Sequence, residues 1–556
     1  MATLNVKFAD NLAYPPFHSM ETTNHTISRA LIIGTRGSVL ALWQANFIKD
    51  ELAAIGVEAE LKIIKTQGDI IQHLRLDKLE GKGFFTKELE EELLSGTIDL
   101  AVHSHKDLPT TNPPGLIIAA VSEREDPSEL LIAHKDCVDP KRRLGLKHNA
   151  LVGTSSNRRK AQLLALRPDL EFDDLRGNII TRIQKLRDEK YDAIMLARAG
   201  VHRINIDLSE FHVEIIPPTE IIPAPAQGVL AVQIREDNQA LYHLLQKLHH
   251  LPTADTIDIE RTVLKQFDAG CHAPLGCYCQ KKDGIYEVWT SNARHSEEFP
   301  DRLFVSGSSK DELLKTIQQR YQLQRTFPQQ VFISREISET SYFARALGKH
   351  KIKVDGQSLI RIFPTMHHLD PFILKHADWL FFCSKNAIEN FFALEPRLSK
   401  KTQLGVIGRG SEESLRQHGL APHFSGEHRG IDMTGIAEEF AHIAEGQTVV
   451  IVRAKDSLET IEKALSETTK VINLPVYETQ LAEEVAKSYA DVLIFTSPSN
   501  AEAYFNFHVV EPGQRIICIG NSTARKIETY GLNYTLPKTP DEIGLAEAVF
   551  GLSFND

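Results

Sequence analysis

Short apolar runs rich in β-branched residues alternate with amphipathic helical patterns from residue 31 onward. Leu31-Ile32-Ile33 is predicted to form a strand, followed by a helix from Ser38 whose apolar residues recur at intervals of three and four up to Ile55. Gly56 then supplies a C-cap. Further strands are predicted at 61–65, 98–102, 151–153 and 192–196, and further helices at 84–94 and after Ser156. This alternation predicts an α/β fold and excludes all-β and all-α folds.

A second α/β unit is predicted to begin near residue 330. The polar stretch 322–330 separates a helical pattern from a new strand at 331–334. Downstream, Ala377-Asp378-Trp379-Leu380-Phe381-Phe382-Cys383-Ser384 recurs as Ala490-Asp491-Val492-Leu493-Ile494-Phe495-Thr496-Ser497. A repeat of roughly a hundred residues is too long for a solenoid and predicts two similar halves that face each other across a cleft.

Composition places the chain among ordinary globular proteins. It has 556 residues, of which 42% are hydrophobic and 25% charged, and this length predicts several domains. No stretch resembles the ~20 apolar residues of a membrane span, and residues 1–30 lack the apolar core of a signal peptide. The six cysteines are too few for a disulfide framework, so we expect reduced thiols and a cytoplasmic protein.

Charge is distributed unevenly along the chain. The balance of 63 Lys+Arg against 74 Asp+Glu argues against a general nucleic-acid binder. One segment is nevertheless dense in arginine: Arg158, Arg159, Arg167, Arg176, Arg182, Arg187, Arg198 and Arg203. Because guanidinium groups match carboxylates and phosphates, this density predicts a small polyanionic ligand. We assign Arg167 and Arg187 to solvated helix faces instead.

The segment Gly153-Thr154-Ser155-Ser156-Asn157-Arg158-Arg159 is predicted to join a strand to a helix. Backbone N–H groups, hydroxyls and guanidinium groups would then converge on a helix N-terminus, which is a typical anion site. We expect either Ser155 or Ser156 to cap the helix. Capping does not explain two adjacent arginines in the first turn, where the helix dipole disfavours cations.

Two further segments carry candidate functional residues. His103-Ser104-His105-Lys106-Asp107 follows an apolar strand, and Asp107 is expected to stay ionised beside Lys106. The glycine-bracketed turn Gly81-Lys82-Gly83 is either a mobile lid or a solvated loop. Turns at Arg36, 104–106 and 155–159 would gather at the carboxyl ends of the strands, where open α/β sheets bind ligands.

Cys271 lies in a Gly/Pro-rich loop and has three possible roles. It is a buried structural residue, a metal ligand together with Cys277 and Cys279, or a nucleophilic or covalently modified thiol. The spacing of these cysteines with His272 does not match the usual pairs of zinc ligands, so we predict no metal site.

Over residues 30–310 these segments together resemble the hydroxymethylbilane synthase family, also called porphobilinogen deaminase. The motifs occur in the family's order: Gly34-Thr35-Arg36-Gly37-Ser38, Gly81-Lys82-Gly83, Ala101-Val102-His103-Ser104 with Lys106-Asp107, Gly153 to Arg159, Leu175-Arg176-Gly177-Asn178, Pro225-Ala226-Gln227-Gly228 and Gly270-Cys271. The resemblance implies an enzyme that polymerises four porphobilinogen molecules to hydroxymethylbilane with release of ammonia.

The resemblance also implies roles for individual residues. Cys271 would carry a dipyrromethane cofactor through a thioether, and Asp107 would be catalytic through contact with pyrrole nitrogens. The other residues implied to bind the cofactor are Ser104, Lys106, Ser155, Arg158, Arg159 and Arg176. Those implied to bind substrate are Arg36, Ser38, Lys82 and Arg182. In the family, such arginines bind acetate and propionate groups.

Residues 330–556 resemble the uroporphyrinogen-III synthase family. This resemblance rests on Val476-Tyr477-Glu478-Thr479, Phe495-Thr496-Ser497-Pro498-Ser499 and Ile519-Gly520-Asn521-Ser522-Thr523-Ala524. It implies cyclisation of the bilane to uroporphyrinogen III in a cleft lined by Ser384, Ser497, Ser522 and Thr523. Tyr477 is either a catalytic residue that assists departure of the terminal hydroxyl or a residue that only packs the hinge.

The two resemblances together imply a domain organisation. A two-lobed, periplasmic-binding-protein-like deaminase unit with a small α+β third domain would be followed by a duplicated two-domain α/β synthase unit. The expected boundaries are 1–29 for an extension, 30–125 with 220–238 for lobe 1, 126–219 for lobe 2, 239–322 for the cofactor-carrying domain, 330–363 with 477–556 for half A, and 364–476 for half B.

We expect a monomer that binds porphobilinogen and hydroxymethylbilane, with no nucleic-acid or membrane partner. A degenerate, non-catalytic C-terminal unit and a two-lobed anion-binding protein are the alternatives.

Overall fold

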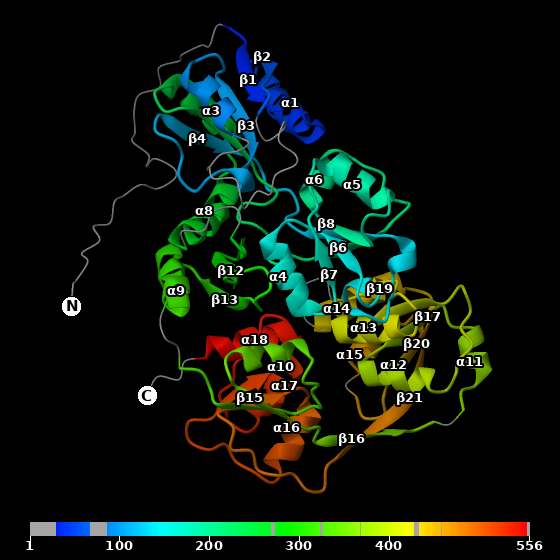
Figure 1. The fold of residues 1–556 in the computed structure, drawn as a ribbon. Helices are drawn as coiled ribbons and strands as arrows, with labels where there is room; N and C mark the ends of the chain where they lie inside the picture. Colours follow the sequence, from blue (N-terminus) through cyan, green and yellow to red (C-terminus); the bar gives the residue numbers. More distant parts are fainter. Residues whose placement is uncertain are drawn as a thin grey trace, which may run out of the picture. The chain divides into compact units, whose positions relative to one another are not determined.

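The chain folds as two units, which we describe separately (Figure 1). The computed structural model describes residues 29–66, 86–267, 273–322, 326–366, 368–426, 433–457 and 459–552. Unit 1 comprises Met1–Val138 and His148–Arg325, and unit 2 comprises Asp139–Lys147 and Thr326–Asp556. Within the described ranges, no helix has both the length and the apolar character needed to cross a membrane.

The first lobe of unit 1 is a five-stranded sheet in the order β2-β1-β3-β10-β4. Its elements are β1 (Leu31–Thr35), α1 (Val39–Ala54), β2 (Ala59–Ile63), α3 (Lys87–Leu94), β3 (Leu100–Ser104), the short 3₁₀ helix η2 (His105–Asp107), β4 (Leu116–Val121), β10 (Leu230–Arg235) and α7 (Gln239–Leu245). Strand β10 runs antiparallel between β3 and β4. The predicted first helix is confirmed, because α1 begins after its N-cap Ser38, and Gly56 follows it with φ of +80°.

The second lobe repeats this arrangement with a sheet in the order β7-β6-β8-β5-β9. Its elements are β5 (Glu129–Ala133), β6 (Leu151–Gly153), α4 (Asn157–Leu166), β7 (Glu171–Asp173), α5 (Ile179–Arg187), β8 (Ala193–Ala197), α6 (Arg198–Arg203) and β9 (His212–Ile216). Here β5 is the antiparallel strand, between β8 and β9. The chain crosses between the lobes twice, at 122–128 and 217–229, which makes the unit periplasmic-binding-protein-like.

A small third domain completes unit 1. Its elements are α8 (Leu251–Gln266), β11 (Leu275–Lys282), β12 (Ile285–Asn292), β13 (Asp301–Gly307) and α9 (Lys310–Gln322). The three strands form an antiparallel sheet. Glu260 of α8 has no exposed surface and accepts hydrogen bonds from Arg124 Nη1 at 2.6 Å and from the backbone N–H groups of Ala226 and Cys279, both at 2.7 Å. This carboxylate therefore ties both crossing segments to β11.

Unit 2 contains a four-stranded parallel sheet in the order β15-β14-β22-β23. Its elements are β14 (Gln330–Ile333), α10 (Tyr342–Lys349), β15 (Lys353–Gly356), β22 (Val492–Phe495), α16 (Pro498–Phe505), β23 (Arg515–Cys518), α17 (Asn521–Glu528) and α18 (Glu542–Gly551). The first and last parts of the unit thus share one sheet, as the orange-to-red elements beside the green β15 show in Figure 1.

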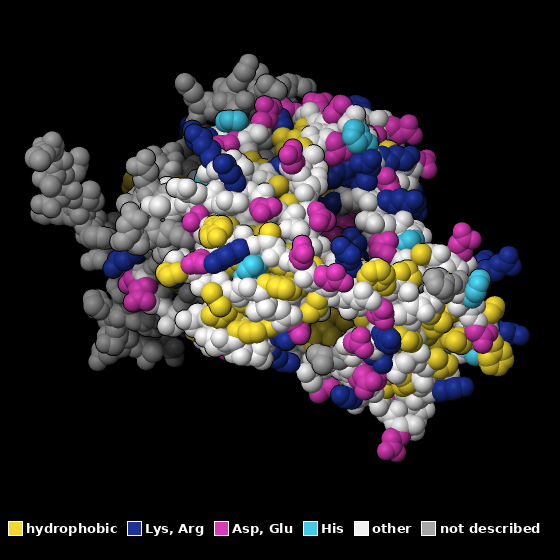
Figure 2. All heavy atoms as spheres, turned by 90° about the horizontal axis from the view of Figure 1, so that it is seen from below, with side chains coloured by type: hydrophobic (Ala, Val, Ile, Leu, Met, Phe, Trp, Pro, Cys, Tyr) yellow, Lys and Arg dark blue, Asp and Glu magenta, His cyan; other side chains and the backbone are white. Residues whose placement is uncertain are grey.

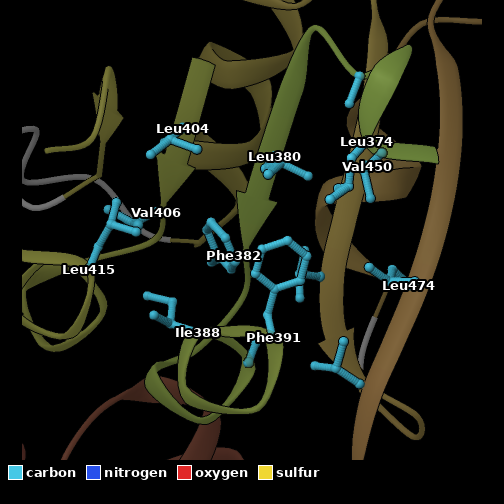
Figure 3. Close-up of a cluster of buried hydrophobic side chains, with 14 of the residues drawn as sticks. Leu374, Leu380, Phe382, Ile388, Phe391, Leu404, Val406, Leu415, Val450 and Leu474 are labelled. Carbon is cyan, nitrogen blue, oxygen red and sulfur yellow. The ribbon is translucent and has the colours of Figure 1, made fainter. Parts of the chain in front are cut away.

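The middle of unit 2 forms a six-stranded sheet in the order β16-β21-β20-β17-β18-β19. Its elements are β16 (Ile360–Pro364), α11 (Pro371–Lys375), β17 (Trp379–Phe382), α12 (Lys385–Phe392), β18 (Gln403–Val406), α13 (Arg409–Gln417), β19 (Phe424–Ser425), α14 (Met433–Ile443), β20 (Thr448–Ala454), α15 (Thr460–Ala464) and β21 (Lys470–Leu481). Figure 3 shows Leu380 and Phe382 of β17 packing against Ile388 and Phe391 of α12, all 0% exposed.

Some predicted boundaries differ from the structure. The strand expected at 98–102 lies at Leu100–Ser104, and the strand expected at 61–65 lies at Ala59–Ile63. The first strand extends further because the backbones of His103 and Ser104 still pair with Ala231 and Leu230 of β10. On the face shown in Figure 2, acidic and basic side chains are interspersed, in keeping with the mixed composition.

Candidate functional site

Lys106 and Asp107 lie in the turn directly after β3, at its carboxyl end. Lys106 Nζ donates a hydrogen bond to Gln227 Oε1 at 3.2 Å. Gln227 is fully buried and donates in turn to the carbonyl of Pro127 at 2.8 Å. Lys106 is thereby held by both crossing segments. The side chain of Asp107 is exposed beside it.

The N-terminus of α4 supplies the second part of the site (Figure 1). Ser156 is its N-cap and accepts from the backbone N–H of Arg159 at 3.4 Å. Ser155 instead donates to the carbonyl of Leu175 at 3.0 Å. The prediction that one of the two serines caps the helix is confirmed.

Arg158 and Arg159 share one carboxylate. Arg158 Nη2 donates to Glu129 Oε1 at 2.8 Å, and Arg159 Nη2 donates to Glu129 Oε2 at 2.7 Å. Both arginines are 6% exposed and Glu129 is 0% exposed. Burial alone would raise the pKa of Glu129, but the charges of the two arginines outweigh it and lower that pKa to about 2.

Electrostatic effects show that these groups belong to one cluster. Burial lowers the pKa of Lys106 to about 8, with Arg159 acting in the same direction and Asp107 in the opposite one. Burial likewise lowers the pKa of Arg182 to about 10, and Arg159 and Arg176 lower it further while Asp107 raises it. Arg182 is also fixed by a 2.8 Å hydrogen bond from Nε to the carbonyl of Gly177. The charge of Asp107 therefore acts on residues of both lobes.

The other predicted residues of unit 1 lie near the same strand ends or serve as caps. Ser104 accepts from Gln44 Nε2 of α1 at 2.8 Å. Ser38 accepts from the N–H of Ala41 at 3.3 Å as the N-cap of α1. Burial lowers the pKa of His103 to about 4, and the charge of Arg36 adds to this effect, which places Arg36 near the end of β3. Lys82 and Cys271 lie outside the described residues.

Not every arginine of the dense segment belongs to the cluster. Arg187 forms an exposed ion pair with Glu210, as expected for a solvated helix face. The same expectation for Arg167 is wrong, because Arg167 is 6% exposed and its guanidinium binds both oxygens of Asp169 at 2.7 Å. Its role is to anchor the C-terminal end of α4.

The two cysteines that follow Cys271 are buried in β11. Cys277 is 0% exposed and Cys279 is 2% exposed. Burial raises the pKa of each thiol above its usual value, which suppresses the thiolate that metals bind. In the part of the chain that the structure describes, three or more His, Cys, Asp or Glu side chains nowhere form a metal-binding group.

The predicted residues of unit 2 lie at strand-to-helix turns. Ser384 is the N-cap of α12, and its Oγ lies 3.0 Å from Tyr477 Oη. Ser497 is the N-cap of α16 and also accepts from Asn500 Nδ2 at 2.8 Å. At the start of α17, Ser522 is exposed, whereas Thr523 is fully buried and its Oγ1 has no hydrogen-bond partner. Burial raises the pKa of Tyr477.

Sequence reasoning missed two residues that hold the unit 1 cluster. Glu129 is the charged first residue of an otherwise apolar strand, and that contrast was the signal available. Gln227 stood inside a quoted motif, but its contacts with Lys106 and Pro127 come from segments about a hundred residues away.

The fold and the charged residues define a two-lobed protein with a cluster of cations at the turns after β3 and β6. A family model described as "Porphobilinogen deaminase, dipyromethane cofactor binding domain" matches residues 31–243, and one described as "Uroporphyrinogen-III synthase HemD" matches residues 341–547. Porphobilinogen deaminase of Nitratidesulfovibrio vulgaris (strain DP4) is 48% identical over 249 residues, which cover 44% of this chain and 77% of that protein.

Another relative and one solved structure are similar to parts of the chain. Porphobilinogen deaminase of Syntrophomonas wolfei is 45% identical over 262 residues, 47% of this chain and 84% of that protein. The crystal structure of uroporphyrinogen-III synthetase from Helicobacter pylori 26695 aligns with a TM-score of 0.30 and 21% identity, covering 39% of this chain and 96% of that chain.

The chain belongs to the porphobilinogen deaminase family and carries a uroporphyrinogen-III synthase domain in its C-terminal part. It is therefore a bifunctional enzyme that joins two steps of tetrapyrrole biosynthesis, with dipyrromethane as the cofactor of its first unit.

The residues present fit such a cofactor. Lys106, Arg158, Arg159 and Arg182 place four cations against the two carboxylates of Glu129 and Asp107, which leaves a surplus of positive charge. The Nε of Arg159 is buried and has no hydrogen-bond partner. A ligand with several carboxylates matches both features.

The lowered pKa of Lys106 leads to a pH-dependent prediction. Lys106 is charged below about pH 8 and neutral above it, so binding of carboxylates should weaken as the pH rises. Because one pKa unit is a tenfold change in ionisation, we expect kcat/KM for porphobilinogen consumption to fall about tenfold by pH 9. In Lys106→Arg this fall should disappear, whereas Lys160→Arg, which changes a half-buried lysine paired with Glu297, should keep it. A Lys106→Arg profile identical to that of the parent would contradict the prediction.

Proposed function

We propose that unit 1 joins four porphobilinogen molecules into hydroxymethylbilane, with release of ammonia, on a dipyrromethane held by Cys271. The observation that carries this proposal is a charge cluster in which both Lys106 and Arg182 interact electrostatically with Arg159 and with the exposed carboxylate of Asp107. When bound, the dipyrromethane supplies the pyrrole to which the first substrate unit is added.

Asp107 is the proposed catalytic residue. Loss of ammonia from porphobilinogen leaves an electron-poor azafulvene cation, and a carboxylate close to its pyrrole nitrogen stabilises that charge. The side chain of Asp107 is exposed and therefore open to a ligand.

The guanidinium groups are proposed to hold the acidic side chains of the growing chain. Each added pyrrole brings two carboxylates, so four additions require many cations in fixed positions. We assign Ser104, Lys106, Ser155, Arg158, Arg159 and Arg176 to the cofactor and Arg36, Ser38, Lys82 and Arg182 to substrate. Among these, Ser38 also has a capping role, and the two roles are compatible because a hydroxyl both accepts and donates.

Asp107→Asn tests the electrostatic role of the carboxylate. The amide keeps the shape and removes the charge, so we expect kcat to fall by about 10²-fold or more while the covalent adduct remains. Asp237→Asn, which changes an exposed carboxylate paired with Arg235, is the control and should leave kcat unchanged. Steady-state rates and intact mass measure both variants. Near-parental turnover in Asp107→Asn would contradict the proposal.

Cys271→Ala tests the attachment of the cofactor. The intact mass should lack the two pyrrole units, and porphobilinogen consumption should be lost, because no other thiol in the loop anchors the primer. Cys277→Ala and Cys279→Ala change buried thiols of β11 and should keep the adduct. An adduct that persists in Cys271→Ala would refute the assignment.

We propose that unit 2 is a duplicated two-domain synthase. Two observations support this. The sheet orders β15-β14-β22-β23 and β21-β20-β17-β18 correspond strand by strand when β22 is matched with β17 through the sequence repeat. The helices that follow also begin alike, with Ser384 and Ser497 as N-caps of one pair and Gly408 and Gly520 as N-caps of the other. The proposed domain boundaries are those given above from the sequence.

This unit is proposed to cyclise hydroxymethylbilane to uroporphyrinogen III, with Ser384, Ser497, Ser522 and Thr523 lining its site. Tyr477 is the proposed catalytic residue because its hydroxyl hydrogen-bonds Ser384 at the end of β17. Its 6% exposure and its place in a hydrophobic cluster support the alternative packing role equally. We further propose a monomeric, cytoplasmic enzyme without nucleic-acid or membrane partners.

Tyr477→Phe separates the two roles of the phenol. Spontaneous closure of the bilane gives the type I isomer, so loss of an assisting hydroxyl should shift the product from type III toward type I without loss of porphobilinogen consumption. Tyr504→Phe removes another buried hydroxyl of unit 2, bonded to Ser488, and should not change the isomer ratio. An unchanged type III yield in Tyr477→Phe assigns the residue to packing. A parent enzyme that yields only type I would refute the synthase proposal.

A further inference from the structure

Glu129 is the one charged residue of β5, whose other residues are apolar. It is the first residue of the strand, directly after the segment that crosses from lobe 1. In register it pairs with Ala197 of β8 on one side and with Ile216 of β9 on the other. A carboxylate with no exposed surface at this position requires strong partners, since an unpaired buried charge is costly.

Its partners are two guanidinium groups in the first turn of α4. Each carboxylate oxygen accepts from a different arginine, at 2.8 Å from Arg158 and 2.7 Å from Arg159. The remaining Nη of Arg158 donates to the carbonyl of Ile222 at 2.9 Å, and that of Arg159 donates to the carbonyl of Met195 at 3.0 Å. Each guanidinium group is therefore fixed by two hydrogen bonds, whereas Nε of Arg159 is buried without a hydrogen-bond partner.

The arrangement explains a feature of the sequence that capping does not. Two adjacent arginines in the first turn of a helix repel each other and the positive end of the helix dipole. Glu129 compensates the positive charges of both arginines, because its carboxylate lies within hydrogen-bond distance of both guanidinium groups. The cations can then remain buried without a bound anion.

Glu129 also acts on Lys106. The charged groups that influence Lys106 are Asp107 on its own turn, Arg158 and Arg159 on α4, and Glu129 on β5, and Gln227 accepts its hydrogen bond. The two arginines oppose protonation of Lys106, while Asp107 and Glu129 favour it. The groups that influence Glu129 are in turn Arg158, Arg159 and Lys106.

We propose that Glu129 is a positioning residue of the deaminase site, which fixes the guanidinium groups of Arg158 and Arg159 and supplies a negative charge that acts on Lys106. Three cations are thereby presented to the carboxylates of the pyrrole chain. The inference rests on the proposed function of this cluster. A purely structural role for Glu129 would affect only stability.

Glu129→Gln keeps the shape of the side chain and removes its charge. The full-length holoenzyme is assayed for kcat and KM with porphobilinogen from pH 6 to 9.5, and rates are divided by the fraction that carries the adduct in the intact mass. Because the variant loses one of the two negative charges that favour the protonated lysine, the basic limb of the pH profile should move about one pH unit lower. KM at pH 7 should rise about tenfold, with a smaller change in kcat.

Glu129→Asp separates charge from geometry. The aspartate restores the negative charge, so the basic limb should return to the position of the parent. Its side chain is one methylene shorter and does not reach both guanidinium groups, so KM should stay raised. Glu260→Gln is the matched control, because Glu260 is an equally buried carboxylate of unit 1 bound to Arg124. It should lower Tm without moving the limb.

The outcomes are distinct. The inference would be overturned in favour of a structural role if Glu129→Gln lowered Tm but kept both the KM of the parent and the position of the basic limb of its pH profile. If Glu129→Gln does not fold, Glu129→Asp decides: a raised KM with a parental limb supports the inference, and a parental KM overturns it. A parent enzyme that does not consume porphobilinogen would instead refute the proposed function itself.

Discussion

Unit 1 depends on two carboxylates that have no exposed surface, Glu129 and Glu260. Glu260 binds Arg124 and the backbone of both crossing segments, and Glu129 binds Arg158 and Arg159. Removing one partner of a buried ion pair typically costs about 3–5 kcal/mol, because the other charge is left without compensation. A buried carboxylate paired with arginine therefore holds the connection between the two lobes, and a second such pairing holds the cationic site.

The two networks also meet. Gln227 lies in the second crossing segment; its backbone carbonyl accepts from Arg124 Nε at 3.0 Å, and its side chain accepts from Lys106. Gln227 therefore contacts both Arg124 of the first crossing segment and Lys106 of the site. In unit 2, Ser384 likewise makes two contacts, because it caps α12 and also lies within hydrogen-bond distance of Tyr477 of β21.

Much of the local structure was predictable from the sequence. The spacing of apolar residues and the cap at Ser38 predicted α1, and the serines before Arg158 predicted the start of α4. Local rules succeed there because a cap and an apolar face are determined by residues within a few positions. They failed for Arg167, whose burial and whose pair with Asp169 depend on how the end of α4 packs. The sequence predicts that hydroxyl residues after strands line the ligand sites. In the structure, Ser38, Ser384 and Ser497 also cap helices.

By itself the sequence determined the α/β class, the two units, the concentration of arginine and the motifs that carry the family resemblance, because each of these is a property of composition, period or order along the chain. Only the tertiary structure decided the strand order of the sheets and the pairing of Arg158 and Arg159 with Glu129, about thirty residues away. It also decided that Lys106 loses part of its affinity for a proton. The reason is physical: desolvation and charge–charge interaction depend on distance in space, and residues far apart in sequence set that distance.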